Sequence, residues 1–264
     1  MFEKKTLYSP QLGRSVNLYI FVPDDCCATS PCPVLYLNDG ELYYGKSSCA
    51  NESGSICFGE YYRTYHQYLP RILIVGIEPP LGRRARTAEL SPYTKSFDTH
   101  GADFDLIVHG RGKELAEWIV CNLKPFVDRT YATLRDQQYT AIGGFSSGAL
   151  NAMYCVMAYS NIFGRLMMHS PAFNLWTDKL EESLRSANFQ SLLSCYMDVG
   201  TNDFTRMTTK EEMLSSAYWM RSQMISHGMV AGRLRFFVIP DGQHSPATWR
   251  WTFPDALRWI FKDC

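Results

Sequence analysis

The amino-acid sequence predicts an α/β fold in which a mostly parallel central sheet is flanked by helices on both faces, and three observations support this prediction. Short apolar segments that suit buried strands alternate along the chain with segments of helical spacing. The length of 264 residues fits one large domain with a full core. The sequence contains no interdomain linker, internal repeat or low-complexity tract. We therefore expect residues 1–264 to form a single α/β domain.

The first part of the chain is expected to supply the first strands of the sheet. These strands are residues 6–9, 15–22, 34–37 and 72–77. Residues 11–14 separate the first two as a hairpin turn, and the later two are continuous apolar runs that suit the inside of a sheet. Residues 61–68 are expected to be helical. The polar stretch 81–108 is expected to be an irregular loop, and a loop of this length usually has a function.

The second part of the chain continues the alternation. The expected strands are residues 139–142, 165–169, 193–199 and 234–239, and the expected helices are residues 112–127, 149–159, 211–227 and 249–261. The first of these helices has four apolar side chains on one face, namely Leu115, Trp118, Ile119 and Leu123. Such an alternation implies parallel strands that are joined by helical crossovers.

The overall composition is that of a globular protein. Hydrophobic residues make up 46% of the chain and charged residues 20%, and the formal net charge is zero. The lack of net positive charge argues against a nucleic acid or an anionic membrane as the main partner. No apolar run approaches the length that spans a bilayer. Because the N-terminal residues show no signal peptide, we expect a cytoplasmic protein. The sequence does not indicate an oligomeric state.

The nine cysteines are scattered and form no Cys-x-x-Cys pair, which argues against a zinc ribbon or a thioredoxin-like site. Three of them, Cys26, Cys27 and Cys32, lie in a loop and are expected to be exposed. A reduced cytoplasm explains this usage most simply, with a disulfide among the early cysteines as the alternative. The histidines have no metal-ligand spacing, so we expect neither a metal nor a cofactor.

The most informative stretch of the sequence is 143–150, which reads Gly-Gly-Phe-Ser-Ser-Gly-Ala-Leu and contains Gly144-x-Ser146-x-Gly148. It lies between an expected strand and an expected helix, which is the context of the nucleophile elbow in α/β-hydrolases. Small residues on both sides of the serine let the strand and the helix approach closely. The motif alone also occurs by chance in loops. A nucleophilic serine therefore requires a base and an acid elsewhere in the chain.

The base and the acid are expected in a fixed order. A serine hydroxyl becomes nucleophilic when a histidine removes its proton, and a carboxylate orients that histidine. In α/β-hydrolases the acid and then the histidine follow the serine along the chain. His244 follows the last expected strand, and the alternative is a histidine of a surface loop. Asp203 follows the strand at 193–199 and is favoured over Asp198, which lies within that strand and suits a structural role.

An oxyanion needs two hydrogen-bond donors. One is expected to be the backbone N–H of Ser147, the residue after the nucleophile. The other is expected from the loop after the strand at 34–37, where Asp39-Gly40-Glu41 offers the backbone N–H of Glu41. The alternative for this loop is an ordinary turn.

These stretches, taken together, resemble the Putative esterase family of α/β-hydrolases, which includes esterase D-like, feruloyl, acetyl-xylan and enterochelin esterases and the mycolyltransferase antigens. The similar stretches are residues 34–41, 89–93, 123–128 with Tyr131, 143–150, 198–203, and His244 with Trp249. The resemblance implies an α/β-hydrolase fold, the triad Ser146, Asp203 and His244, and an oxyanion hole at Glu41 and Ser147. Two departures are Ala149, where many members have glycine, and Phe145, where a small residue is frequent.

The function that we expect is hydrolysis of a small-molecule carboxylic ester through an acyl-enzyme, with acetyl, feruloyl, thioester or siderophore-type esters all open. An acyltransferase with the same triad and a non-catalytic binding protein are the alternatives. The loop 81–108 is expected to shape the mouth of the substrate site.

Several other side chains have two interpretations each. His169 suits an acyl pocket or, preferably, a buried position bonded to the backbone. The arginines of the loop suit either an acidic leaving group or, preferably, solvent, and three tryptophans suit either the site wall or the core. These are Arg83, Arg84 and Arg86, and Trp176, Trp249 and Trp251.

Overall fold

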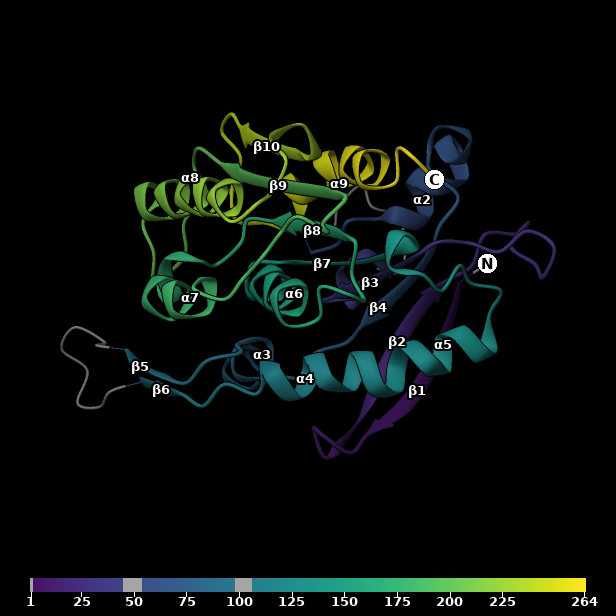
Figure 1. The fold of residues 1–264 in the computed structure, drawn as a ribbon, viewed down its shortest axis with the longest axis horizontal. Coiled ribbons are helices and arrows are strands. Elements are labelled where there is room, and N and C mark those ends of the chain that lie inside the picture. The colour runs from purple at the N-terminus through teal and green to yellow at the C-terminus, as the bar shows by residue number, and fades with distance from the viewer. Residues whose placement is uncertain (1, 45–53, 98–105) are drawn as a thin grey trace.

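The computed structural model describes residues 2–44, 54–97 and 106–264, and these residues build a twisted eight-stranded sheet (Figure 1). The order of the strands is β1-β2-β4-β3-β7-β8-β9-β10. Their bounds are β1 Phe2–Ser9, β2 Arg14–Phe21, β3 Val34–Asn38, β4 Leu73–Ile77, β7 Thr140–Phe145, β8 Arg165–His169, β9 Ser194–Gly200 and β10 Leu234–Ile239. All eight strands expected from the sequence are therefore present, with β1 starting earlier than expected.

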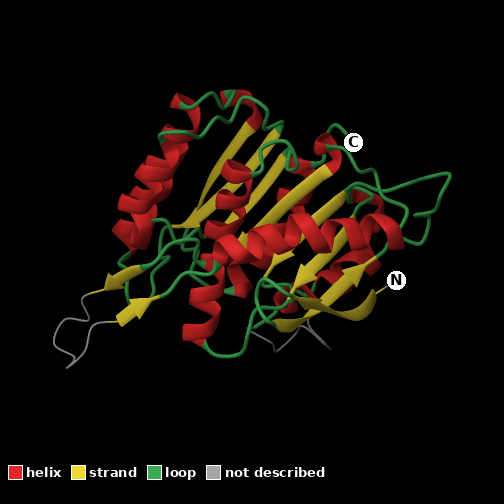
Figure 2. Cartoon of the chain, turned by 60° about the horizontal axis from the view of Figure 1, so that its bottom comes forward, coloured by secondary structure: helices red, strands yellow, loops and turns green. Residues whose placement is uncertain are grey.

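The sheet is antiparallel at one end and parallel over the rest. β1 pairs with β2, and β2 with β4, in antiparallel register. All pairs from β4 through β3, β7, β8 and β9 to β10 are parallel. Because neighbouring parallel strands point the same way, the loops that follow β3, β7, β8, β9 and β10 meet at one edge of the sheet (Figure 2).

Helices cover both faces of the sheet. The helices are α1 Glu41–Tyr44, α2 Phe58–Tyr65, α3 Arg83–Leu90, α4 Gly112–Trp118, α5 Lys124–Thr130, α6 Ser147–Ala158, α7 Thr177–Leu184, α8 Lys210–Ser226 and α9 Pro246–Ile260. A π-helical segment, η2 (Ile119–Leu123), joins α4 to α5, and together the three fulfil the helix expected at 112–127. Short 3-10 turns complete the description: η1 His66–Tyr68, η3 Gln137–Tyr139, η4 Asn174–Trp176 and η5 Ala231–Arg233.

The side chains of each central strand divide between two cores. In β3, Tyr36 packs with α4, α6 and their neighbours, whereas Leu35 and Leu37 pack with α1, α2 and α9. All five residues of β3 are buried, since both faces of a parallel sheet are covered. This explains why β3 reads as a continuous apolar run in the sequence.

The stretch 81–108 differs from the expected irregular loop. It contains α3 and a small separate hairpin of β5 (Lys95–Phe97) and β6 (Leu106–Val108), which projects from the body in Figure 1. Its residues 98–105 lie outside the described residues. Arg14 of β2 forms a two-pronged ion pair with Glu89 at the end of α3. This ion pair fixes α3, a helix of mostly Arg and Ala, to the sheet. The polar composition of the stretch gave no sign in the sequence that a helix would pack there.

The cysteines also differ in part from expectation. Cys32 is fully buried beneath the start of β3, whereas Cys27 is exposed as expected. Cys26, Cys27 and Cys32 are free thiols, but Cys57 is disulfide-bonded, so the expectation of a wholly reduced protein is wrong. Cys49 lies outside the described residues.

Candidate functional site

Ser146 occupies a sharp turn between β7 and α6. Its backbone is left-handed, with φ 56° and ψ −119°, a conformation that costs energy for a residue with a side chain. The strand and the helix approach so closely that a Cβ added to Gly144 would lie 2.4 Å from the carbonyl carbon of Gly148. The two glycines of Gly144-x-Ser146-x-Gly148 are thus required by close packing, as the elbow interpretation predicts.

Strained backbone is concentrated at the edge of the sheet where Ser146 lies. Asp39, Ser146, Ser170 and Asp241 all have positive φ, and they follow β3, β7, β8 and β10 respectively. Non-glycine residues in this region are uncommon, and they cluster where a fold over-determines a functional geometry. This edge is therefore the candidate active site.

His244 and Asp203 form a close pair at the same edge. Nδ1 of His244 lies 2.7 Å from Oδ1 of Asp203. Asp203 is completely buried, whereas the His244 side chain keeps 16% exposure. Because an ionised carboxylate only accepts hydrogen bonds, Nδ1 carries the proton of this pair. The other ring nitrogen, Nε2, is then left with a free lone pair that can accept a proton.

The loops that carry these two residues are bonded to each other. A Cβ on Gly200 would lie 2.0 Å from the carbonyl oxygen of Gly242, so the loops after β9 and β10 touch backbone to backbone. Asn202 N–H donates to that same oxygen at 3.0 Å, and Asp241 N–H donates to the Thr201 hydroxyl at 2.8 Å. These contacts fix Asp203 and His244 relative to each other.

A second carboxylate–histidine pair lies below the site. Nδ1 of His169 is 2.7 Å from Oδ2 of Asp198, and both side chains are fully buried. The sequence favours a backbone partner for His169, but the partner of its Nδ1 is a carboxylate. Its other ring nitrogen, Nε2, is buried without a hydrogen-bond partner among the described residues. Asp198 also accepts from Ser170 N–H at 3.4 Å, which fits the structural role expected for it.

A stack of rings connects the two pairs. Phe145, directly before Ser146, stacks on His169 with ring centroids 5.1 Å apart and on Trp249 at 5.0 Å. Trp249 in turn meets His244 edge to face at 5.4 Å. Within the described residues Ser146 and His244 share no hydrogen bond. The indole of Trp249 contacts both the ring of His244 and the ring of Phe145, the residue before Ser146. The unusual Phe145 is thus part of the support for the site.

The three tryptophans have different positions. Trp249 and Trp176 are buried, and the Trp249 indole N–H donates to the Ser170 hydroxyl at 2.8 Å. Trp251 is 82% exposed, so it belongs neither to the core nor to a wall of the site.

The two residues whose backbone N–H groups are expected to bind the oxyanion, Glu41 and Ser147, are the first residues of α1 and α6. In the turn after β3, Gly40 N–H donates to Ile77 O at 2.9 Å and Leu42 N–H donates to Asp39 O at 3.0 Å. The N–H between them, that of Glu41, is the donor that neither of these bonds uses. Ser147 is the first residue of α6, where a helix N–H has no partner within the helix.

An ion pair that the sequence did not reveal joins the two segments. Arg86 of α3 donates from Nε and Nη2 to the two carboxylate oxygens of Asp39, at 2.6 and 2.7 Å. Nη2 also donates to Phe145 O at 3.4 Å. Asp39 is completely buried, and its Oδ2 would lie 2.5 Å from a Cβ added to Gly148. Arg86, expected in solvent, instead binds the turn after β3 to the nucleophile elbow.

Glu41 carries a carboxyl group beside this ion pair. Its Oε2 is buried and has no hydrogen-bond partner among the described residues. Burial raises the pKa of Glu41 to about 8, and the neighbouring carboxylates of Asp39 and Glu78 add to the rise. The backbone N–H of Glu41 itself and the positive charge of Arg86 lower this pKa, but by less than burial raises it. At neutral pH Glu41 is therefore mainly uncharged.

The described residues contain neither a cluster of metal ligands nor a helix that could span a membrane. Across residues 2–44, 54–97 and 106–264, no group of three or more His, Cys, Asp and Glu side chains is arranged to hold a metal ion. No helix in these ranges combines the length and the apolar character that crossing a membrane requires.

Comparison with known proteins places the chain among esterases. The model of the family described as "Putative esterase" matches residues 9–260. The uncharacterized protein YbbA of Bacillus subtilis is 20% identical over 252 residues, which cover 94% of this chain and 93% of that protein.

Solved structures agree in their fold. Ferric enterobactin esterase from Salmonella typhimurium superimposes with a TM-score of 0.75 at 15% identity, over 99% of this chain and 58% of that longer chain. An IroE-like serine hydrolase from Shewanella oneidensis gives 0.73 at 19% identity, over 100% of this chain and 81% of its own. At these identities the likeness shows a shared fold, and the α/β-hydrolase fold expected from the sequence is confirmed.

Proposed function

Because this chain belongs to the Putative esterase family, we propose that it is a serine hydrolase that cleaves small-molecule carboxylic esters with Ser146, His244 and Asp203 as its triad. Nε2 of His244 accepts the proton of Ser146 as the hydroxyl oxygen attacks the ester carbonyl. Asp203 holds the imidazole in the required tautomer and stabilises its positive charge. The alcohol leaves with a proton from His244, and water then releases the acid from the acyl-enzyme.

The negative charge that develops on the carbonyl oxygen is assigned to two backbone donors. The N–H groups of Glu41 and Ser147 come from the turn after β3 and from the first turn of α6. Such donors are fixed before the reaction begins, so they stabilise the oxyanion without reorganising. The ion pair of Arg86 with Asp39 supports this arrangement, because it holds both segments in place.

The observation that carries the proposal is the pair of His244 and Asp203 on the same edge as the strained Ser146. A histidine that is held at 2.7 Å by a buried carboxylate and keeps part of its side chain exposed suits the role of a general base. Its place in the chain after the acid, and the acid's place after Ser146, match the order of α/β-hydrolases.

Labelling with a fluorophosphonate probe tests this proposal, together with turnover of p-nitrophenyl esters of increasing chain length. We expect Ser146→Ala to lose both the label and at least about 1000-fold of turnover. Ser147→Ala is the matched control, because it removes a neighbouring hydroxyl and keeps the backbone N–H. Full labelling of Ser146→Ala, or equal losses in both variants, would contradict the assignment of the nucleophile.

A further inference from the structure

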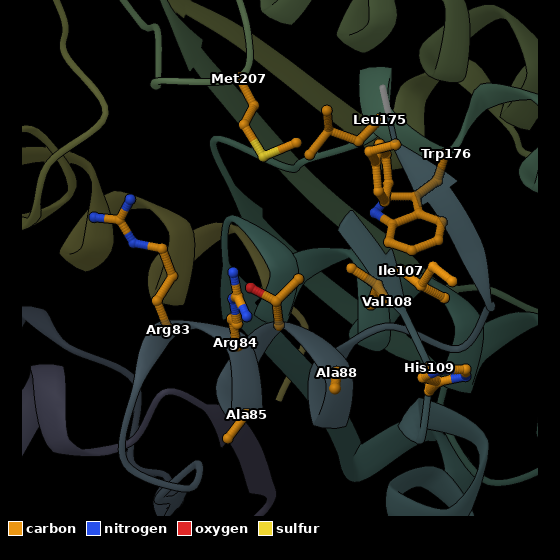
Figure 3. A pocket seen from close by; sticks show the side chains of 12 residues that line it. Arg83, Arg84, Ala85, Ala88, Ile107, Val108, His109, Leu175, Trp176 and Met207 are labelled. Carbon is orange, nitrogen blue, oxygen red and sulfur yellow. The ribbon is translucent and has the colours of Figure 1, made fainter. Parts of the chain in front are cut away.

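A cavity of about 520 Å³ lies between α3, the β5–β6 hairpin, the segment after β8 and the loop after β9 (Figure 3). The segments that line it at Arg83, Leu175 and Met207 follow β4, β8 and β9. Ala172 N–H, in the segment that leads to Leu175, donates to Ser146 O at 3.2 Å. The cavity therefore lies at the edge of the sheet where the parallel strands end, together with the candidate active site.

The opposite edge of the sheet, where the parallel strands begin, holds a compact group of two thiols and one guanidinium. Cys26 and Cys32 belong to the segment before β3, and Arg71 lies just before β4. The backbone of Cys32 pairs with the segment before β7, because its N–H accepts Ala132 O as a partner at 2.9 Å and its carbonyl oxygen accepts from Leu134 N–H at 2.8 Å. The length of the strands separates this group from the candidate active site.

A tight turn brings Cys26 close to Cys32. Cys27 and Ser30 pair in antiparallel register, so Cys26 lies within one position of Cys32 across the turn. Cys26 Sγ donates to Ala132 O at 3.3 Å, and the same oxygen accepts from Cys32 N–H. Residues that face each other across such a turn have the Cα separation that a disulfide spans.

The two thiols are hydrogen-bond neighbours beside a positive charge. Burial, and after it the hydrogen bond with the Cys26 thiol, raises the pKa of Cys32 to about 12. Arg71 acts in the opposite direction, since its Nη1 donates to Cys32 Sγ at 3.0 Å. The guanidinium is itself fixed, because Nη2 donates to Ser30 O at 2.8 Å and Nε lies 3.0 Å from Oδ2 of Asp25. Neighbouring sulfur atoms beside a cation are well placed for thiol–disulfide exchange.

The two thiols differ in their access to solvent. Cys26 is partly exposed, whereas Cys32 is completely buried. A reagent in solution therefore meets Cys26 first, and Cys32 is reached only from within the protein. Cys27 is exposed as well, but its thiol pairs with the hydroxyl of Thr29 at 3.3 Å. Cys26 is thus the entry point and Cys32 its internal partner.

We propose that Cys26 and Cys32 form a modification site, at which a small-molecule disulfide such as oxidised glutathione converts the two thiols into a protein disulfide. The Cys26 thiolate attacks one sulfur of the reagent, whose S–S bond breaks, and the departing thiolate takes up the proton that Cys26 has lost. The Cys32 thiolate then attacks the Cys26 sulfur of this mixed disulfide. The second thiolate leaves and takes up the proton of Cys32. Two protein thiols are oxidised, and the reagent is reduced to two thiols.

The new cross-link would fasten the exposed loop before β3 to the start of that strand. It closes a ring over residues 26–32, and a closed ring restricts the unfolded chain. Cys57 of the same chain is disulfide-bonded, so the fold accommodates oxidised cysteines. The inference concerns the edge away from the candidate active site and does not depend on the proposed function.

Mass spectrometry tests the modification on the full chain. Oxidised glutathione is added to the folded protein, remaining thiols are blocked with iodoacetamide, and the protein is digested with trypsin without reduction. Residues 15–46 form one tryptic peptide that carries Cys26, Cys27 and Cys32. The variant Cys27→Ser removes the exposed neighbouring thiol and keeps the pair. We expect its peptide to lose the mass of two hydrogen atoms and to take up neither an alkyl group nor glutathione.

Two further variants in the Cys27→Ser background assign the two roles. With Cys32→Ala, Cys26 has no internal partner and should keep glutathione as a lasting mixed disulfide. With Cys26→Ser, the buried Cys32 should stay unmodified until the protein is unfolded in urea. Because Cys26 is partly exposed, Cys26→Ser should fold even if Cys32→Ala does not.

Two results would overturn the proposal. One is a Cys27→Ser peptide in which both remaining thiols are alkylated after treatment with oxidised glutathione. The other is a lasting mixed disulfide on Cys26 while Cys32 is present, because the buried thiol would then fail to close the cross-link. Neither measurement requires ester turnover, so a failure of this site and a failure of the proposed function are separate results.

Discussion

Two carboxylate–histidine pairs lie among the described residues of this protein, and they have the same length but different surroundings. Asp203 and His244 are 2.7 Å apart, and so are Asp198 and His169. His244 keeps partial exposure on a loop beyond β10, whereas His169 is enclosed at the end of β8 beneath the ring of Phe145. A short contact with a carboxylate therefore does not by itself identify a general base.

The difference between the pairs lies in the second nitrogen of each histidine. A general base needs an accessible Nε2 that can exchange a proton with the substrate. Nε2 of His169 is buried without a partner among the described residues, so proton exchange with a ligand is blocked there. The buried pair instead fixes the floor on which Phe145 and Ser146 rest, since Ser146 N–H donates to His169 O at 2.9 Å.

The largest effect on activity or stability is expected when each of the two histidines is replaced by alanine in a separate variant. His244→Ala should lower kcat by about 1000-fold or more and destabilise the fold less than His169→Ala, because water can replace the partly exposed imidazole beside Asp203. His169→Ala should instead destabilise the fold by about 3 kcal/mol or more, because Asp198 is left buried and unpaired. Ester turnover and urea unfolding of both variants measure this, and the comparison breaks if His169→Ala shows the greater loss of kcat in fully folded protein.

The two aspartates give the next largest effect. Asp203→Asn is expected to lower kcat by about 100-fold to 10,000-fold, because an amide no longer enforces the tautomer that leaves Nε2 of His244 free. Asp198→Asn should change kcat far less and lower the melting temperature instead. Steady-state kinetics and thermal unfolding on the same preparations separate the two effects. Equal losses of kcat would show that both pairs take part in the reaction.

A third contrast uses two ion pairs on α3, of which only one reaches the site. Asp39→Asn keeps the left-handed turn that asparagine tolerates but weakens the bond to Arg86, so the oxyanion donors should lose alignment and kcat should fall about tenfold. Glu89→Gln weakens the matching pair with Arg14 at the far end of the helix. We expect it to alter stability and leave kcat within about twofold. A similar fall in kcat for both variants would mean that α3 acts as a whole.

The smallest effect concerns Glu41, whose Oε2 has no hydrogen-bond partner among the described residues, in contrast to the paired aspartates. Its pKa is about 8 in the folded protein against 4.5 for a free glutamate side chain, so the folded state holds the proton more tightly. Stability contributed by the neutral form is therefore complete at low pH and is lost as the pH rises from about 4.5 through 8. Glu41→Gln should match wild type near pH 4 and exceed it by about 1 kcal/mol or more at pH 8. Urea unfolding across this range tests it, and a constant difference would contradict the assigned protonation.

The sequence predicts the parts of this protein that depend on local pattern. Buried strands such as β3 are recognisable because both of their faces are apolar. The motif around Ser146 is recognisable because the close approach of strand and helix requires glycine at Gly144 and Gly148. The placement of Asp203 and His244 follows from the order of strands in a parallel sheet, and the structure puts them within hydrogen-bond distance of each other.

The remaining parts depend on pairings between distant segments. Arg86 looks like a solvated arginine until α3 is placed beside Asp39, which is 47 positions away in the chain. The carboxylate partner of His169 is equally invisible, because neighbouring strands bring it there and a one-dimensional pattern does not.

The position of β10 has a consequence for how the protein would lose activity. β10 lies at the border of the described sheet with β9 as its neighbour, and the loop directly after it carries His244. Border strands open in local fluctuations that cost less free energy than global unfolding. Detachment of this one strand would remove His244 from Asp203 while β3, β7 and the elbow stayed folded. Loss of turnover on warming would then precede loss of helical signal, and the shelf life of the catalyst would be set by a single peripheral strand.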